Sequence, residues 1–375
     1  MSGTTATTAR EVAEEVLRPK AQEIDRKRRY PKEGLAALGK KGLAGILIPA
    51  AQGGLGGTLS DLAQACEALG WGCASTAMCF LMHACGTAVI GAKATAEQAD
   101  AWLKPAAKGK ALATLAFSER GSGAHFYAPE ISAATKNGSF VLSGRKSFVT
   151  SGGHAALYPV LVNASGEPGL DVIVVTPDLP GVGFDGTWDG IGMAGNSSIA
   201  MTLDDVKVPR ANIVGAEGDG QSLVFDVVAP TFLIGLAGVN VGIAHAALEE
   251  AAEHAKARRY PTGQTLADVQ AIQMGLADMS IAVEAARRLL REAARAADAG
   301  EATALPLVMQ AKIAATEAAA SVTERAMRIG GGQAYSRSLP IERHWRDARA
   351  GAVMAPTNDV LREWLGKILT GLPLF

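Results

Sequence analysis

The chain has 375 residues, with 36 Lys plus Arg against 37 Asp plus Glu and a formal net charge of -1. This length exceeds one typical hydrophobic core, so we expect two or three packed units. The balanced charge gives no global field that would attract nucleic acid or an anionic membrane, and the sequence therefore predicts neither partner.

The cysteines and the N-terminus indicate the compartment. Cys66, Cys73, Cys79 and Cys85 lie in one Ala-rich stretch without a Cys-x-x-Cys pair, so we expect buried reduced thiols rather than zinc ligands or disulfides. Residues 1–10 contain no apolar signal core, and no later stretch offers about 18 unbroken apolar residues. The sequence therefore predicts a soluble, cytoplasmic protein.

Residues 1–110 show the period of amphipathic helices. Val12 and Val16 begin a series of apolar residues at helix-face spacing, as expected for helices that pack on a core. The glycine-rich segment 51–57 interrupts this series. After it, one helix is predicted to run from Leu59 to Ala92, with an apolar stripe that is most simply a helix core.

Residues 111–215 alternate between apolar and polar side chains, which is typical of strands. Asn137-Gly138 stands between the runs 131–135 and 140–143, and Asn-Gly at such a place is a strong hairpin signal. Clusters of Gly, Pro and Asp separate the other apolar runs. These runs are 160–162, 172–175 and 199–203. The middle of the chain is therefore predicted to be a β unit.

Residues 216–375 return to the helical period. Met279, Val283 and Leu290 lie on one predicted helix face, and Gly300 suits a C-terminal cap. Four long helices fit into this length.

Two segments of the β unit carry the chemistry. Small residues at 121–124 let the backbone approach a planar or anionic ligand, although most glycine-rich turns are only turns. The first segment, Ser118-Glu-Arg-Gly-Ser-Gly-Ala-His125, resembles the one by which acyl-CoA dehydrogenases hold the flavin ring. The second, Lys146-Ser-Phe-Val-Thr-Ser-Gly-Gly153, is similar to their second flavin strand.

The resemblance covers essentially the whole chain, because helical, β and helical parts follow in the same order in that family. It implies an α+β fold with an N-terminal helical domain (1–110), a middle β-barrel-like domain (111–215) and a C-terminal four-helix bundle (216–375). It also implies FAD as cofactor, a CoA thioester or similarly activated acyl substrate, and a homotetramer. Either O2 or an electron-transfer flavoprotein would reoxidise the flavin.

The resemblance also implies contacts to the flavin ring. Ser118 and Thr150 match positions that hydrogen-bond the ring, Phe148 matches an aromatic beside it, and Phe117 adjoins Ser118 in the first segment. Without the resemblance, an ordinary strand Thr and a core Phe would be the simpler interpretation.

A second set of contacts would serve the cofactor of a neighbouring subunit. Arg258 matches an arginine on the cofactor pyrophosphate, a role that suits its planar fork, and Gln270 matches a nearby polar contact. Gly331 and Gly332 match the glycine turn at the adenine end, and Arg328 stands where glutamine is frequent. The alternative for such an arginine is a surface charge of little consequence.

The catalytic glutamate of the family has no counterpart. Counting on from Arg346-Asp347, which match an Arg-Asp signature, the usual Glu-Gly-Thr falls on Ala355-Pro356-Thr357. α,β-Dehydrogenation of a thioester needs a carboxylate to remove the α-proton while flavin N5 accepts the β-hydride. Some relatives carry the carboxylate on the first long C-terminal helix, but Phe232 and Leu233 occupy that region here.

Two residues remain as catalytic candidates. Asp359 is the nearest carboxylate, but it matches a cofactor contact, as does Thr357, so a flavin or helix N-terminal contact is its simpler interpretation. His83 lies where the family forms the floor of the acyl pocket. A lone His on an apolar helix is more often a core residue, but one facing a flavin could protonate an oxygenated adduct.

Two functions are therefore open. The first is an FAD-dependent oxidoreductase that acts by dehydrogenation with a relocated base or by a divergent flavin reaction, such as oxygenation of the monooxygenase type or desulfination. The second is a non-catalytic flavin-binding scaffold. The missing glutamate favours divergence, while retention of Thr150, Arg258 and the glycine turn argues against a scaffold.

Overall fold

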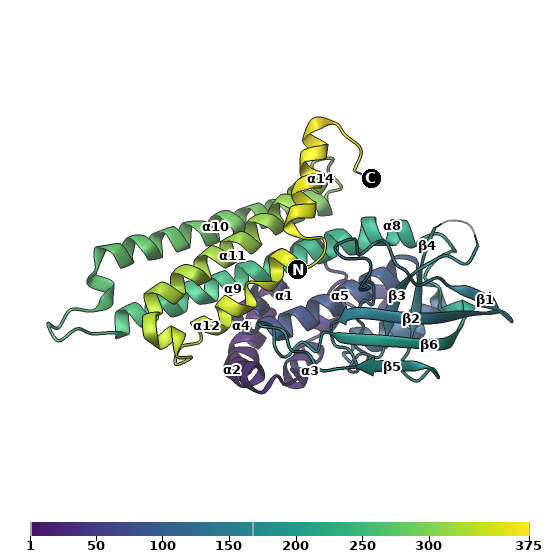
Figure 1. The fold of residues 1–375 in the computed structure, drawn as a ribbon, viewed down its shortest axis with the longest axis horizontal. Helices are drawn as coiled ribbons and strands as arrows, with labels where there is room; N and C mark the ends of the chain where they lie inside the picture. The colour runs from purple at the N-terminus through teal and green to yellow at the C-terminus, as the bar shows by residue number, and fades with distance from the viewer. Residues whose placement is uncertain (1, 167–168, 375) are drawn as a thin grey trace.

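The computed structural model describes residues 2–166 and 169–374. Figure 1 shows a β unit at one end of the molecule and long helices that extend from it towards the other end. The first N-terminal helices lie beneath the long helices and beside the β unit. The helices of this first part are α1 (Ser2–Val12), α2 (Arg18–Lys27), α3 (Lys32–Lys40), α4 (Leu59–Gly72), α5 (Ala74–Lys93), α6 (Ala96–Gln98) and α7 (Lys104–Ala107).

The predicted single helix over 59–92 is wrong, because the chain breaks at Cys73 into α4 and α5. Cys73 has extended backbone, with φ -161° and ψ 110°, and it ends one helix and begins the next. The break lets α4 and α5 follow different directions in the interior. The prediction of buried, free thiols is confirmed for all four cysteines.

Within residues 2–166 and 169–374, two helical stretches are long and apolar enough to cross a membrane, but both are core helices of this fold. They are Ala74–Lys93 and Gly220–Ala257, and 89% and 78% of their most apolar windows are buried inside the molecule. Burial by other protein segments explains why both have apolar residues on every face.

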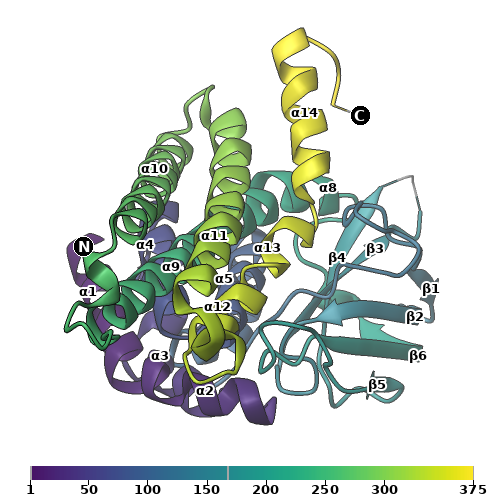
Figure 2. The ribbon, with the colours of Figure 1, turned by 60° about the vertical axis from the view of Figure 1, so that its left-hand side comes forward.

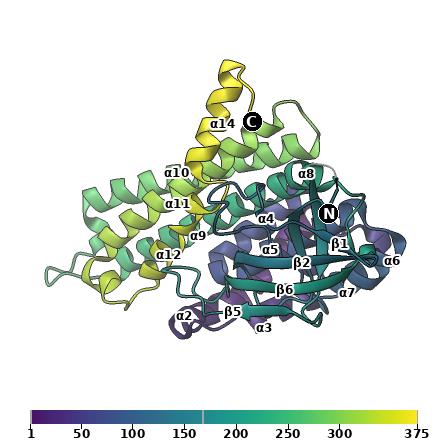
Figure 3. The same ribbon diagram turned by 45° about the vertical axis from the view of Figure 1, so that its right-hand side comes forward.

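The described residues of the β unit form two antiparallel sheets, and Figure 3 shows the strands of the larger one lying side by side. Asn137 and Gly138 both have positive φ, 50° and 75°, so the predicted Asn-Gly hairpin is confirmed between β1 and β2. One apolar cluster, which includes Phe140, Tyr158 and Met201, is shared by both sheets. The sheets are β1 (Ala134–Lys136), β2 (Ser139–Val149), β6 (Ile199–Pro209) and β5 (Val182–Asp185), in this order, and the pair β3 (Tyr158–Asn163) and β4 (Leu170–Val175).

The C-terminal part has three long helices where four were predicted. The later elements are short because Gly331, with φ 53° and ψ -138°, interrupts the end of α11 and Pro340 precedes α12. The elements are α8 (Gly220–Ser222), α9 (Ala229–Ala257), α10 (Gln270–Asp298), α11 (Ala304–Tyr335), α12 (Ile341–Asp347), α13 (Ala350–Val353) and α14 (Asn358–Thr370).

The N-terminal helix α4 packs directly on α9 and joins the long helices. Gly238 and Gly242, one turn apart on α9, permit this approach, since a Cβ at either position would collide with the backbone oxygen of Ala63 or Glu67. The bundle is therefore completed by a helix from the other end of the sequence. Figure 2 shows α14 projecting away from it.

Candidate active site

A cavity of about 550 Å³ lies where the three parts of the chain meet. The β unit provides its polar wall, and helices α5 and α9 provide an apolar wall. The segment after α12 closes the remaining side. The lining residues used below are Met78, Met82, Phe117, Ser118, Glu119, Arg120, Ser147, Phe148, Thr150, Asn196, Ser198, Val228, Phe232, Met354, Ala355 and Pro356.

The two predicted flavin segments lie side by side in this wall. The backbone N–H of Ser147 donates to the Ser118 carbonyl oxygen over 2.8 Å, which joins the segments directly. The Thr150 and Ser198 hydroxyl oxygens are 2.9 Å apart. Phe117, Ser118 and Thr150 are therefore brought together in one cavity wall.

Phe148 lies in the same wall in an unusual backbone conformation. Its φ is 53°, a left-handed conformation that is uncommon for a bulky residue and that concentrates at functional sites. The ring is 68% exposed and meets Trp188 edge-on, with ring centroids 6.4 Å apart. The backbone thus holds an aromatic surface at the cavity instead of burying it in the core.

Glu119 is the one carboxylate among the described lining residues, and it is fully engaged. Its Oε1 lies 2.5 Å from the buried Lys146 ammonium, and its Oε2 accepts the backbone N–H of Glu130 over 2.7 Å. Lys146 also donates to the Leu161 carbonyl oxygen, and burial lowers its pKa to about 8. This pair fastens the first segment to the sheet. Sequence reasoning missed it, since the two residues are 27 positions apart and form no local motif.

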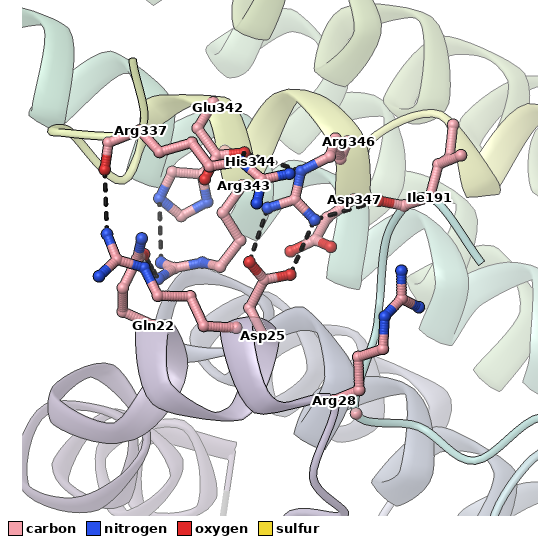
Figure 4. Close-up of polar contacts among 12 residues, drawn as sticks. Gln22, Asp25, Arg28, Ile191, Arg337, Glu342, Arg343, His344, Arg346 and Asp347 are labelled. Carbon is pink, nitrogen blue, oxygen red and sulfur yellow. Dashed lines mark hydrogen bonds and ion pairs between the residues drawn. The ribbon is translucent and has the colours of Figure 1, made fainter. Parts of the chain in front are cut away.

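A polar junction of three segments fixes the loop between β5 and β6, which forms another side of the cavity (Figure 4). The Arg346 guanidinium on α12 donates to both carboxylate oxygens of Asp25 on α2, over 2.8 and 2.6 Å. It also reaches the Ile191 carbonyl oxygen over 3.1 Å. The neighbouring Asp347 accepts the backbone N–H of Met193 over 2.6 Å, and burial raises the pKa of this carboxyl to about 6. Arg346 and Asp347, the residues of the matched Arg-Asp signature, thus hold the loop between β5 and β6 in place; we call this pair the clamp.

Asn196, at the end of this loop, has a buried amide without a partner. The residue is 1% exposed, and neither Nδ2 nor Oδ1 has a hydrogen-bond partner among the described residues. Because buried polar groups are normally paired, a polar ligand in the cavity would satisfy it. An isoalloxazine ring presents N–H and C=O groups along one edge, so the polar wall and this amide fit a flavin.

His83 does not line the cavity. Its hydrogen bonds do not fit the predicted role of a catalytic acid. Its Nε2 lies 2.9 Å from the Ala44 carbonyl oxygen, and its Nδ1 accepts the backbone N–H of Ala113 over 3.0 Å. Burial lowers the pKa of the ring to about 4. Both nitrogens are thus used to join α5 to two other segments, which is a structural role.

Asp359 and Thr357 lie beside the cavity rather than in its described wall. The Thr357 hydroxyl caps α14 by accepting the backbone N–H of Val360 over 3.3 Å. The Asp359 side chain is 97% exposed and occupies the first turn of that helix, where an acidic residue is favoured. Asp359 therefore does not face the cavity of this chain as a base.

The second predicted set of cofactor residues lies at the far end of the bundle. Arg258 ends α9 and Gln270 begins α10, while Gly331 lies at the kink near the end of α11. In Figure 1 these helix ends lie at the side opposite the β unit. With Arg328 and Gly332, all five belong to one end of the molecule and none lines the cavity.

Comparisons with known proteins agree with this architecture. Three family models match consecutive parts of the chain: acyl-CoA dehydrogenase, N-terminal domain (residues 4–110), middle domain (114–206) and C-terminal domain (234–370). The mitochondrial short-chain specific acyl-CoA dehydrogenase of Bos taurus is 32% identical over 361 residues, covering 95% of this chain and 86% of the relative. Cyclohex-1-ene-1-carbonyl-CoA dehydrogenase of Geobacter metallireducens is 32% identical over 364 residues, covering 96% and 95%.

Solved structures show the same fold. Butyryl-CoA dehydrogenase from Megasphaera elsdenii superimposes with a TM-score of 0.93 at 29% identity, over 98% of each chain. Three family models in order, relatives above 30% identity and the shared fold lead to one conclusion. This chain belongs to the acyl-CoA dehydrogenase family, whose members depend on FAD.

Proposed function

We propose that the chain is an FAD-dependent oxidoreductase that acts on a CoA thioester. The names of the relatives support this substrate class, since they include dehydrogenases of short-chain acyl-CoA and of cyclohex-1-ene-1-carbonyl-CoA. The separation of the cavity into a polar side and an apolar side also supports this substrate class. The β side offers hydroxyls and the Asn196 amide to a flavin ring, and Met82, Val228 and Phe232 offer an apolar surface to an acyl group.

We further propose that the reaction differs from ordinary dehydrogenation. The observation that carries this is the lack of a free carboxylate among the described lining residues. Glu119 is held by Lys146 and by backbone N–H groups. By the sequence resemblance, Ala355 and the region of Phe232 fall where the family carries its base. A bound flavin would accept hydride, but the α-proton would have no side-chain acceptor.

The size of this effect follows from general-base catalysis, which contributes about 10²–10⁴-fold. Saturated straight-chain acyl-CoAs should therefore be oxidised slowly. The native substrate would have an unusually acidic α-position, or the flavin would take part in another reaction, such as oxygenation or desulfination. The buried, unpartnered Asn196 amide supports a bound polar ligand, and a non-catalytic flavin-binding scaffold would show no change of flavin absorbance with any thioester.

The test is to mix the FAD-loaded protein with a panel of acyl-CoAs, with and without oxygen, and to follow the flavin absorbance. We expect slow anaerobic bleaching by saturated acyl-CoAs, and at most a weak gain in Ala355→Glu, since Pro356 restricts the backbone there. Faster bleaching by α-activated thioesters, or turnover that requires oxygen, would support divergence. Rapid anaerobic bleaching of the unmodified protein by saturated acyl-CoAs would refute it.

We also propose a homotetramer in which each subunit completes the cofactor site of another. The support is the position of Arg258 and Gly331 at the end of the bundle away from the cavity, where they cannot reach a flavin in the same chain's cavity. Analytical ultracentrifugation with absorbance at the flavin wavelength tests this. FAD should co-sediment with the oligomer, and a fully active monomer would contradict the proposal.

A further inference from the structure

Lys312, in the first half of α11, is a fully buried lysine that has no role in the proposed function. Its ammonium donates to the carbonyl oxygen of Pro356 over 3.0 Å, to that of Met354 over 3.4 Å and to Asn358 Oδ1 over 2.9 Å. These three acceptors match the three protons of the group. No described carboxylate forms an ion pair with it.

The direction of these bonds determines what the cavity wall presents. Met354, Ala355 and Pro356 line the cavity, whereas no described residue of α11 does. Carbonyl oxygens that accept protons from Lys312 therefore point towards α11 and away from the cavity. The cavity wall therefore lacks these two backbone acceptors, at Met354 and Pro356.

Asn358 and Thr316 complete the arrangement. The Asn358 amide donates to the Thr316 hydroxyl over 3.0 Å, which orients its Oδ1 towards Lys312. Thr316 lies one turn after Lys312 on the same face of α11. Gly351 in α13 brings the backbone close, since a Cβ there would lie 2.7 Å from the Thr316 methyl group. Two consecutive turns of α11 thus fasten the segment 351–358.

We propose that Lys312 is a positioning residue for the active-site cavity: it turns the backbone carbonyls of Met354 and Pro356 outwards and so sets an apolar wall where relatives place the catalytic carboxylate. This rests on the proposed function only in taking the ligands to be a flavin and an acyl thioester. Without the ammonium, two buried carbonyl oxygens would lose their partner, which is unfavourable. The segment would then loosen, or turn an oxygen into the cavity against the acyl group.

The test uses the FAD-loaded full chain with Lys312→Met, which keeps the length of the side chain and removes the donors. Ser321→Ala is the matched control, because Ser321 lies on the exposed side of the same helix and bonds only to Ala318 of that helix. Hydrogen exchange of the peptide covering 354–361 should accelerate by at least about tenfold in Lys312→Met, since about tenfold is the factor for one ordinary hydrogen bond and the change removes three. Exchange in the β unit should not change, and the control should match the unmodified protein.

Kinetics provide the second measurement. With the most reactive thioester of the panel, KM should rise about tenfold in Lys312→Met while kcat changes less, since the wall contacts the ligand without supplying a reacting group. A uniform increase in exchange over the whole protein would overturn the proposal, and so would unchanged exchange in 354–361. If no thioester reacts with the unmodified protein, the proposed function fails, but the hydrogen-exchange result still tests the positioning role of Lys312. If Lys312→Met does not fold, Asn358→Ala, which removes one acceptor, should give the same local acceleration.

Discussion

His83 should make the stability of this protein depend on pH. The ring is buried and neutral, with Nδ1 accepting the Ala113 N–H and Nε2 facing the Ala44 carbonyl oxygen. If Nδ1 were protonated, its N–H would face the backbone N–H of Ala113, and neither donor would have an acceptor. Burial accordingly lowers the pKa of the ring from 6.5 to about 4.

The sign and size of this pH effect follow from the difference in proton binding between the unfolded and native states. Between pH 6.5 and about 4 the unfolded chain binds a proton at this histidine and the native protein does not, so the free energy of unfolding falls as the pH falls. The contribution is fully present above pH 6.5. A difference of 6.5 minus 4, or about 2.5 pH units, at about 1.4 kcal/mol per unit corresponds to roughly 3–4 kcal/mol.

The assay is urea unfolding of the unmodified protein and of His83→Asn at several pH values from 7.5 to 4.5. Asparagine can still accept the Ala113 N–H but does not titrate, so the stability gap between the two proteins should shrink by most of this amount as the pH falls. Exchange of the exposed His125 for Gln is the control and should leave the pH dependence unchanged. His344, which is also buried with a pKa well below its usual value, contributes equally to both proteins and cancels. A constant gap over this range would refute the reasoning.

Three further predictions concern the clamp and the cofactor. Arg346→Met should destabilise the protein by about 3–5 kcal/mol, because it leaves the buried Asp25 carboxylate without its ion pair and removes the nearer of two cations from Glu342. In urea unfolding, Asp25→Asn combined with Arg346→Met should cost less than the sum of the two single changes, and strict additivity would exclude the coupling. Asn196→Ala should weaken FAD binding about tenfold and shift the flavin spectrum if its amide pairs with the ring, whereas an unchanged dissociation constant measured by fluorescence would remove the flavin as its partner. Arg258→Ala should lower FAD retention during gel filtration, and full occupancy would show that this arginine does not hold the cofactor.

Features that depend on local pattern could be predicted from the amino-acid sequence alone. The Asn137-Gly138 hairpin follows from two residues that tolerate positive φ. The order of helical and β parts follows from the change of apolar period, from about 3.6 to 2 and back. The two segments around Ser118 and Thr150 could be selected as partners because their motifs resemble a known family, and they do share one wall.

Features that depend on partners distant in the sequence became visible only in the folded chain. The break at Cys73 and the number of long helices escaped prediction, because an apolar helical period does not show where a buried helix must change direction. The role of His83 was decided by Ala44 and Ala113, which come from two other segments. The acceptors of Lys312 are 42–46 residues away, so its buried position in an Ala-rich helix had no local signal. Such contacts follow from how the segments pack in three dimensions, which the spacing of residues along the chain does not encode.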